Sequence, residues 1–245
     1  MHFFYLQPPI EHQPNGKVLL NKEESFHAIR VMRIKIGKAF HLVDGLGTLY
    51  KAIYVGEVKG QCEMEITETI HNYQPISRPI HIAIAPAKNA ARNEWFLEKA
   101  TEIGISEISF IQCEHSERSV INLERCQKIL IAAIKQSERA YLPHLHDLLP
   151  FKKWVSQSFH ATKLIGHCGP EVLPITHVIK NNNIPGNSIN KSDGYLMAIG
   201  PEGGFSSDEI NLAQQHQFSP VSLGPSKLRT ETAALTACVA LNLLP

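Results

Sequence analysis

The feature that most constrains the fold is an alternation of short apolar runs with helical patterns after residue 79. The β-type runs are Ile80–Ala85, Ile105–Ile111, Lys163–Gly166, Tyr195–Ile199 and Pro220–Leu223. The helical patterns are Asn93–Ile103, Leu123–Ala140, Phe151–Phe159, Ser207–Gln217 and Glu231–Leu244. Strands that alternate with helices in this way predict a mainly parallel sheet with helices on both faces. The expected fold class is therefore α/β.

The sequence before residue 74 has a different, β-rich pattern. Apolar and polar residues alternate on either side of Asp44-Gly45, a pair typical of hairpin turns. A second β-prone run, CEMEITETI, follows, and Ser25–Ile34 is expected to form a short helix ahead of these strands. Short strands joined by turns favour a small barrel or sandwich. We predict two domains, residues 1–73 and 74–245, joined near the proline-containing segment Asn72–Pro79.

Local patterns argue against membrane and secreted classes. The longest uninterrupted apolar run, Ile129–Ile134, has six residues, against the roughly 20 that span a bilayer. The N-terminal residues lack the basic leader and long apolar segment of a secretion signal. The five cysteines form no CxxC pair, a pattern typical of free thiols in a reducing compartment. We expect a cytoplasmic protein.

Histidine spacing predicts no metal site. The 13 histidines include no HExxH pattern. His144 and His146, with Asp147, lie in a stretch bounded by prolines, which we interpret as a loop carrying incidental surface histidines. A second loop is expected at Lys180–Gly194, which is polar and rich in Asn, Gly and Pro.

The formal net charge of +1 is low for a nucleic-acid binder, so the position of basic residues matters more than their sum. Arg30, Arg33, Lys35 and Lys38 fall within nine residues. Such a cluster is consistent with an RNA contact and equally with a solvated surface, and charge alone does not distinguish the two.

The first chemically informative motif is AIGPEGGFSSDEI, Ala198–Ile210. An apolar strand ends at Gly200-Pro201, and after two more glycines a helix begins near Ser206. Glycines at such a bend indicate positive φ angles or close approach by another group, and this edge of an open α/β sheet is where ligands bind. No Walker A or GxGxxG pattern is present, which disfavours a phosphate cradle. The alternative is an ordinary tight turn.

The second motif is SLGPSKLRTETAALTACVALN, Ser222–Asn242. A strand again ends at a Gly-Pro pair, Gly224-Pro225, and a helix begins at Thr230–Thr232. Arg229 precedes this helix, as either a fixed electrostatic group or a surface residue. Two such bends in one sheet suggest a single pocket built mostly from backbone. A pocket of this kind suits a nucleoside whose adenine is read by main-chain groups.

These motifs resemble the RsmE family of ribosomal RNA uridine-N3 methyltransferases, in the SPOUT superfamily. Supporting stretches are HAIRVMRIKIG, KNAARNEWFLEKATEIGISEI, SERSV and KQSERAYLP, so the resemblance covers nearly the whole chain. It implies a PUA-like β-barrel followed by an α/β domain with a deep trefoil knot. It also implies S-adenosylmethionine as cofactor, a homodimer, and methylation of N3 of a uridine in 16S ribosomal RNA near the decoding centre. The implied partner is the free 16S ribosomal RNA or the small ribosomal subunit. One departure is that Met1-His2 stands where the family often has basic residues.

The resemblance also implies site residues. The cofactor loops would be Gly200–Gly204 and Leu223–Thr232, with Gly166–Gly169 as a third wall. The expected cofactor-binding residues are His167, Gly200, Gly203, Gly204, Leu223, Ser226, Leu228, Arg229 and Thr232. For catalysis we expect Arg229 to stabilise an oxyanion, with Glu202 and Glu231 as base or orienting partners. Alternatively, Glu202 faces solvent and Glu231 only favours its helix N-terminus. The expected RNA contacts are Arg30, Arg33 and Lys35 in the first domain and Arg118 and Arg139 in the second.

Two other functions fit the same residues. One is a catalytically silent RNA-binding or ribosome-assembly protein that kept the fold. The other is a methyltransferase that acts on another RNA or on a ribose 2′-hydroxyl. Binding of S-adenosylmethionine would distinguish the first of these from an enzyme.

Overall fold

The computed structural model describes residues 2–10, 16–169, 172–180 and 194–243, in two compact units. The first contains residues 1–75 with 131–142, and the second contains residues 76–130 with 143–245. Residues 131–142 belong to the first unit, although the predicted domain division placed them in the second. The sequence did not indicate this, because no change of composition marks either end of the segment.

The first unit is β-rich, as predicted. Its strands are β1 (Phe3–Tyr5), β2 (Lys17–Leu19), β3 (Ala39–Val43), β4 (Leu49–Val58) and β5 (Gln61–Ile70), in the sheet order β1-β3-β4-β5-β2. The pair β1–β3 is parallel and the others are antiparallel. The turn between β3 and β4 lies at Asp44-Gly45, where the Asp44 carboxylate accepts the backbone N–H groups of Leu46 (2.8 Å) and Thr48 (3.0 Å).

The helix predicted at Ser25–Ile34 is wrong in its bounds and partly in its type. Helix α1 spans Lys22–Phe26, because the Asn21 side chain caps it by accepting the N–H of Glu24 at 2.8 Å. A π-helical turn, η1 (His27–Val31), continues it. The helical segment ends before Arg33, whose φ of 50° lies in the left-handed region.

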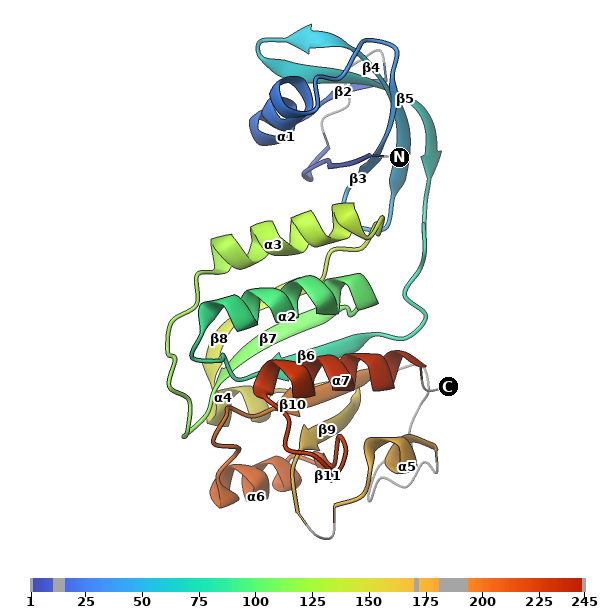
Figure 1. Ribbon diagram of the computed structural model, residues 1–245. Helices are drawn as coiled ribbons and strands as arrows, with labels where there is room; N and C mark the ends of the chain where they lie inside the picture. The colour runs from blue at the N-terminus through green and yellow to red at the C-terminus, as the bar shows by residue number, and fades with distance from the viewer. Residues whose placement is uncertain (1, 11–15, 170–171, 181–193, 244–245) are drawn as a thin grey trace. The chain divides into compact units, whose positions relative to one another are not determined.

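The second unit contains a six-stranded sheet in which every neighbouring pair is parallel (Figure 1). Its strands are β6 (Ile80–Ile84), β7 (Glu107–Gln112), β8 (His144–Pro150), β9 (Thr162–Gly166), β10 (Tyr195–Ile199) and β11 (Ser219–Val221), in the order β11-β9-β10-β6-β7-β8. Every residue of the central strands β6 and β10 is buried, so both faces of the sheet are covered. The predicted parallel α/β sheet is confirmed.

Helices of the second unit pack in two groups. These helices are α2 (Ala90–Ile103), α4 (Phe151–Val155), α5 (Ile175–Lys180), α6 (Ser207–Gln215) and α7 (Thr230–Leu243). Helix α2 lies beside α7, which packs on β6 and β10, while α4 packs on α6 around a core that includes Trp154 (Figure 1). Helix α3 (Leu123–Gln136) begins in this unit, and its residues from Ile131 onward belong to the first.

Of the two predicted loops, one is a strand in the structure and the other lies mostly outside the described residues. The stretch with His144, His146 and Asp147 is not a loop but the edge strand β8, bounded by Pro143 and ending at Pro150. Proline is compatible with an edge strand because such a strand has unpaired N–H positions. Most of the second expected loop, residues 181–193, lies outside the described residues. No helix in the described ranges is long and apolar enough to cross a membrane.

Candidate functional site

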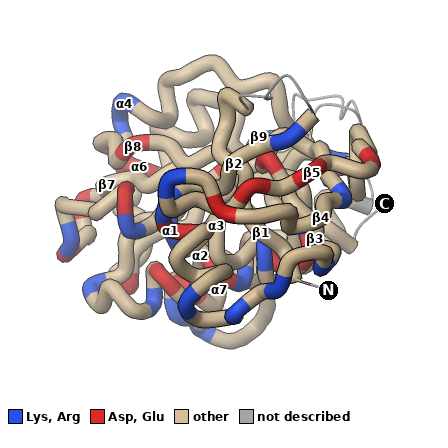
Figure 2. Tube along the Cα trace, turned by 90° about the horizontal axis from the view of Figure 1, so that it is seen from above, with Lys and Arg blue, Asp and Glu red and all other residues tan. Residues whose placement is uncertain are grey.

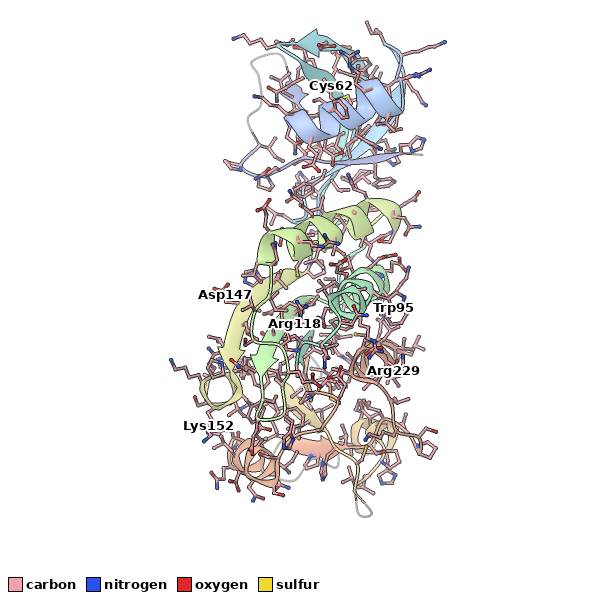
Figure 3. The ribbon with its side chains drawn as sticks, turned by 60° about the vertical axis from the view of Figure 1, so that its left-hand side comes forward. Cys62, Trp95, Arg118, Asp147, Lys152 and Arg229 are labelled. Carbon is pink, nitrogen blue, oxygen red and sulfur yellow. The ribbon has the colours of Figure 1, made fainter. Side chains whose placement is uncertain are left out.

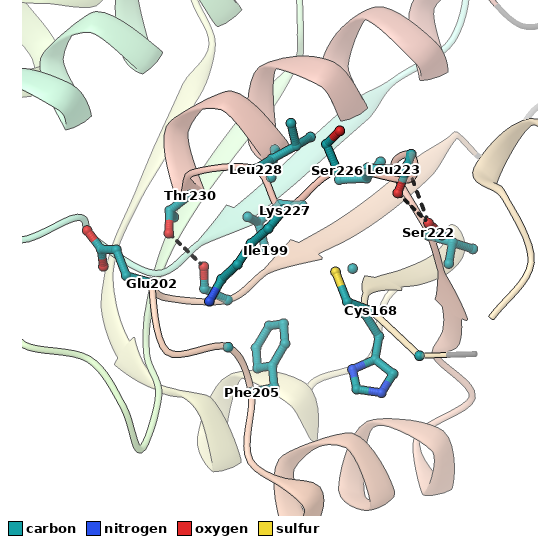
Figure 4. A pocket seen from close by; sticks show the side chains of 18 of the residues that line it. Cys168, Ile199, Glu202, Phe205, Ser222, Leu223, Ser226, Lys227, Leu228 and Thr230 are labelled. Atoms are coloured by element: carbon teal, nitrogen blue, oxygen red, sulfur yellow. Dashed lines mark hydrogen bonds between the residues drawn. The ribbon is translucent and has the colours of Figure 1, made fainter. Parts of the chain in front are cut away.

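A pocket of about 660 Å³ lies at the carboxyl ends of β9, β10 and β11 (Figure 4). These strands are neighbours at one side of the sheet, so the loops that follow them meet at one edge. The lining comes from Gly166–Gly169 after β9, Ile199–Phe205 around the end of β10, Val221–Leu228 around the end of β11, and Thr230 and Ala233 of α7. The volume falls in the range of about 300–1,000 Å³ typical of small-molecule sites.

Glycine is required at two places in this lining for different reasons. Gly204 has a φ of +76°, a left-handed conformation that side chains disfavour. Gly203 has no such φ, but a Cβ there would lie 3.0 Å from Cβ of His115. The loop after β10 therefore presents main-chain atoms to the pocket, and substitution at either position would move it.

Hydrogen bonds hold the loop after β10 at its far end. Ser206 and Glu209 form a reciprocal cap of α6: Oγ of Ser206 accepts the N–H of Glu209 (3.3 Å), and Oε2 of Glu209 accepts the N–H of Ser206 (2.9 Å). The other carboxylate oxygen of Glu209 accepts the N–H of Glu114 at 2.9 Å, and Nδ1 of His115 lies 3.1 Å from the carbonyl oxygen of Gly204. The residues after β7 are thus tied to the pocket loop.

A second set of hydrogen bonds connects this loop with the helix that closes the pocket. The buried Thr230, first residue of α7, donates its hydroxyl to the Gly200 carbonyl at 3.1 Å (Figure 4). In the loop after β11, Oγ of Ser222 accepts the N–H of Gly224 at 3.3 Å and donates to the carbonyl of the same glycine at 3.1 Å. Both Gly-Pro bends are therefore fixed by short polar side chains.

Glu202 and Lys227 are the charged residues among those that line the pocket. The Lys227 side chain reaches from the loop after β11 toward the end of β10 (Figure 4). The remaining lining is neutral and rich in glycine and proline. One cation is too little for a triphosphate, whereas a mostly neutral, backbone-rich wall suits a nucleoside with a small charged tail.

The pocket brings together most of the residues expected to hold a cofactor. His167, Gly200, Gly203, Gly204, Leu223, Ser226 and Leu228 all line it, and so does Glu202. Cys168, Phe205 and Lys227 also line the pocket but were not named individually as site residues. Cys168 and Lys227 lie within stretches expected to form the pocket, and Phe205 lies within the first motif.

Arg229, Glu231 and Thr232 are not among the lining residues. Arg229 is exposed just before α7 (Figure 3), and within the described part of the chain its guanidinium forms no ion pair. Glu231 is buried, with Oε1 at 3.5 Å from Nε of Arg92 and Oε2 without a hydrogen-bond partner in the described residues. Thr232 is exposed on the first turn of α7.

The residues expected to contact RNA have different surroundings. Arg30, Arg33 and Lys35 are exposed in and after η1. Arg118 is half-buried, and its Nε donates to the carbonyl of Lys88 at 3.3 Å. Arg139, expected in the second domain, belongs to the first unit, and burial lowers the pKa of its guanidinium. Lys and Arg positions are mixed with Asp and Glu positions along the trace (Figure 2).

Comparisons with known proteins agree with this architecture. A family model described as the RNA methyltransferase domain matches residues 74–242, and one described as the RNA methyltransferase PUA domain matches residues 20–67. Over 233 residues the chain is 30% identical to the ribosomal RNA small subunit methyltransferase E of Synechocystis, covering 93% of this chain and 73% of that protein.

Solved structures give the same result. The probable rRNA-methyltransferase of Porphyromonas gingivalis has a TM-score of 0.83 and 35% identity, covering 100% of this chain and 98% of that one. The ribosomal RNA small subunit methyltransferase E of Neisseria gonorrhoeae, bound to S-adenosyl methionine, has a TM-score of 0.81 and 27% identity, covering 100% and 98%. The fold and the matched models thus define an RNA methyltransferase domain with a PUA domain. Within that class, the chain belongs to the ribosomal RNA small subunit methyltransferase E (RsmE) family.

Proposed function

We propose that this protein binds S-adenosylmethionine in the pocket after β9, β10 and β11 and methylates N3 of a uridine in 16S ribosomal RNA, near the decoding centre. The observation that carries the proposal is the pocket itself, a backbone-rich cavity of about 660 Å³ built from the two Gly-Pro bends. Two relatives of similar fold, from Legionella pneumophila and Neisseria gonorrhoeae, are described as bound to S-adenosylmethionine, which supports this choice of cofactor.

The chemistry of the lining fits this cofactor. Main-chain N–H and C=O groups of Gly200–Gly204 and Leu223–Leu228 can pair with an adenine and exclude water from it. The ammonium of Lys227 can pair with the carboxylate of the methionine part of the cofactor. The carboxylate of Glu202 can pair with a positively charged group of the cofactor, its sulfonium or its ammonium. When bound, the cofactor supplies a methyl group on a sulfonium, a reactive electrophile that needs no metal.

The acceptor requires more of the protein than the methyl donor does. N3 of uracil carries a proton and becomes nucleophilic only when that proton leaves and the negative charge spreads over O2 and O4. We propose that Arg229 stabilises this charge, because it is a cation directly after the pocket-lining Leu228 and has no ion pair in the described part of the chain. Glu202, on the pocket wall, is the better placed carboxylate to accept the proton. Glu231 is buried against Arg92 and is better placed to orient than to accept a proton.

The remaining parts of the proposal concern RNA and assembly. Arg30, Arg33 and Lys35 are exposed and can contact phosphates, with Arg118 and Arg139 contributing further contacts. Such contacts position the RNA, while the target base must be splayed out to reach the donor. We also propose the family's PUA-like barrel over residues 1–73, its trefoil knot within residues 74–245, a homodimer, and action in the cytoplasm. Membership of the family supports these parts of the proposal.

Arg229→Ala tests the catalytic part of the proposal. We expect methylation to fall at least a hundredfold with little change in the affinity for S-adenosylmethionine, since the loss of one oxyanion-stabilising group costs about 2.7–4 kcal/mol in the transition state. The assay is transfer of a labelled methyl group to small ribosomal subunits, with calorimetry for the cofactor. Near-normal methylation by this variant would remove Arg229 from the mechanism.

Nucleoside mass spectrometry of ribosomal RNA from cells that lack the gene tests the reaction and substrate. Loss of one N3-methyluridine from 16S RNA is the expected result. Loss of a ribose 2′-O-methyl group, or of a mark in another RNA, would support the broader methyltransferase alternative. An unchanged spectrum together with no binding of S-adenosylmethionine would support the silent ribosome-assembly protein.

A further inference from the structure

Three neighbouring strands bring two histidines and a carboxylate together at the edge of the sheet away from the pocket. His81 lies near the start of β6, Glu107 begins β7, and His146 lies in the first half of β8. In the register of the sheet His81 pairs with Glu107, Glu107 with His144, and Ser109 with His146. Residues in register, or two apart on one strand, project from the same face, so these side chains share one face at the amino ends of the strands.

The ligand-bearing atoms of these side chains converge. Nε2 of His146 lies 2.8 Å from Oε2 of Glu107, and Nδ1 of His81 lies 3.8 Å from the same oxygen. One nitrogen or oxygen from each of the three residues lies within 4.8 Å of the other two. A tetrahedral zinc ion with bonds of about 2.0–2.1 Å to nitrogen and oxygen sets its ligand atoms about 3.3 Å apart. The observed distances lie on both sides of that value, so small side-chain rotations suffice.

The surroundings orient the histidines. Nε2 of His81 lies 2.8 Å from Oγ of Ser109, and a proton on Nε2 leaves the lone pair of Nδ1 facing Glu107. A hydrogen bond to the other ring nitrogen is the arrangement usual for metal-binding histidines. His81 is only 9% exposed, packs edge-on against Phe159 and stacks on His146 at 5.2 Å between ring centres. The site is therefore fixed on its inner side and open to solvent through His146 and Glu107, whose side chains are 36% and 41% exposed.

We propose that His81, Glu107 and His146 form a binding site for a divalent transition metal, with Zn²⁺ the best match. Two imidazole nitrogens and one carboxylate oxygen suit Zn²⁺, and they are less suited to Mg²⁺ or Ca²⁺, which prefer all-oxygen sites. The fourth position is left to water or to His144, whose ring lies edge-on to that of His146 at 4.4 Å. Bound metal would connect β6 and β7 with the edge strand β8.

Calorimetric titration of the metal-free full-length protein, without an affinity tag, with ZnCl₂ tests the site. We expect one Zn²⁺ per chain and a rise in the unfolding temperature with added zinc, because the ion binds the folded state. His146→Gln and Glu107→Gln should each weaken zinc binding at least tenfold. Both side chains are partly exposed, so the variants are expected to fold, which circular dichroism would verify. His71→Gln, at an exposed histidine outside the cluster, is the matched control and should bind as the wild type does.

Cobalt substitution provides a second measurement. Co²⁺ in a four-coordinate site of this kind gives visible absorption bands that both variants should lose and the control should keep. The proposal is overturned if the wild type binds no zinc at micromolar concentration, or if both variants bind it as well as the wild type does. The affinity for S-adenosylmethionine serves as a separate reference, since the cluster lies at the opposite ends of the strands from the pocket.

Discussion

The Glu209 carboxylate links the end of the pocket loop to the residues after β7, and replacing it with glutamine tests how much this link contributes to stability. One oxygen accepts the N–H of Ser206 and the other the N–H of Glu114, both at 2.9 Å, and the side chain is buried. Glutamine has nearly the same shape but offers one acceptor oxygen and an NH₂ group. Whichever way the amide is oriented, one backbone N–H faces another N–H and loses its partner.

The expected cost follows from these contacts. A hydrogen bond to a charged group contributes about 1.5–3 kcal/mol to folding, and one such bond is lost in Glu209→Gln. For a domain of this size, each kcal/mol shifts the unfolding temperature by about 2–4 °C. The variant should therefore unfold about 3–12 °C below the wild type. The lost bond holds either Ser206, which follows the Gly200–Phe205 loop, or Glu114, whose neighbour His115 contacts Gly204 of that loop. The affinity for S-adenosylmethionine should therefore also fall severalfold.

Differential scanning calorimetry and cofactor titration of the variant and a matched control measure both effects. Asp208→Asn removes the same charge from the same first turn of α6, but Asp208 is exposed and should lose only the dipole interaction of about 0.3–1 kcal/mol. If Glu209→Gln and Asp208→Asn unfold within a degree of each other, the two anchoring hydrogen bonds do not stabilise this loop and the reasoning is refuted.

Two further substitutions test other contacts. Thr230→Val removes the hydroxyl that donates to the Gly200 carbonyl and should weaken cofactor binding severalfold in calorimetry. The control Thr236→Val loses only a hydrogen bond within α7 and should bind as the wild type does. Equal affinities of the two variants would contradict a role of the Thr230–Gly200 bond in the pocket. In the first unit, Lys135→Met leaves the buried Glu24 carboxylate without its ion-pair partner and should cost about 3–5 kcal/mol in chemical denaturation, most of which the added change Glu24→Gln should restore.

Much of the second unit could be predicted because its elements carry local signals. The strand predicted at Tyr195–Ile199 has those bounds in the structure, and the helix predicted to begin near Ser206 is α6, which Ser206 caps. Other boundaries depended on tertiary contacts. Strand β8 was missed because prolines on both sides resemble loop signals, and only its place at the sheet edge makes Pro150 compatible with a strand.

The pocket and the proposed metal site also differ in how far the sequence reveals them. Both Gly-Pro bends were visible in the sequence, since each is a continuous motif, and the structure places them around one pocket. The cluster of His81, Glu107 and His146 was not visible, because its members come from three strands that are far apart in sequence. His144, His146 and Asp147 look like a local group, but the carboxylate that meets His146 is Glu107, and Asp147 is exposed on β8 (Figure 3).

The pocket wall and the residues proposed for RNA chemistry should respond differently to substitution. Six of the 21 residues that line the wall are glycines, so we expect its function to depend on backbone shape at residues such as Gly203 and Gly204. Arg229 is exposed outside the wall and contributes a side-chain charge, which backbone shape cannot replace. Substitutions that distort the bends should therefore reduce cofactor affinity and turnover together, whereas substitutions at Arg229 should reduce turnover alone. This difference separates binding of the methyl donor from activation of the acceptor, and it follows from which atoms, main-chain or side-chain, each step uses.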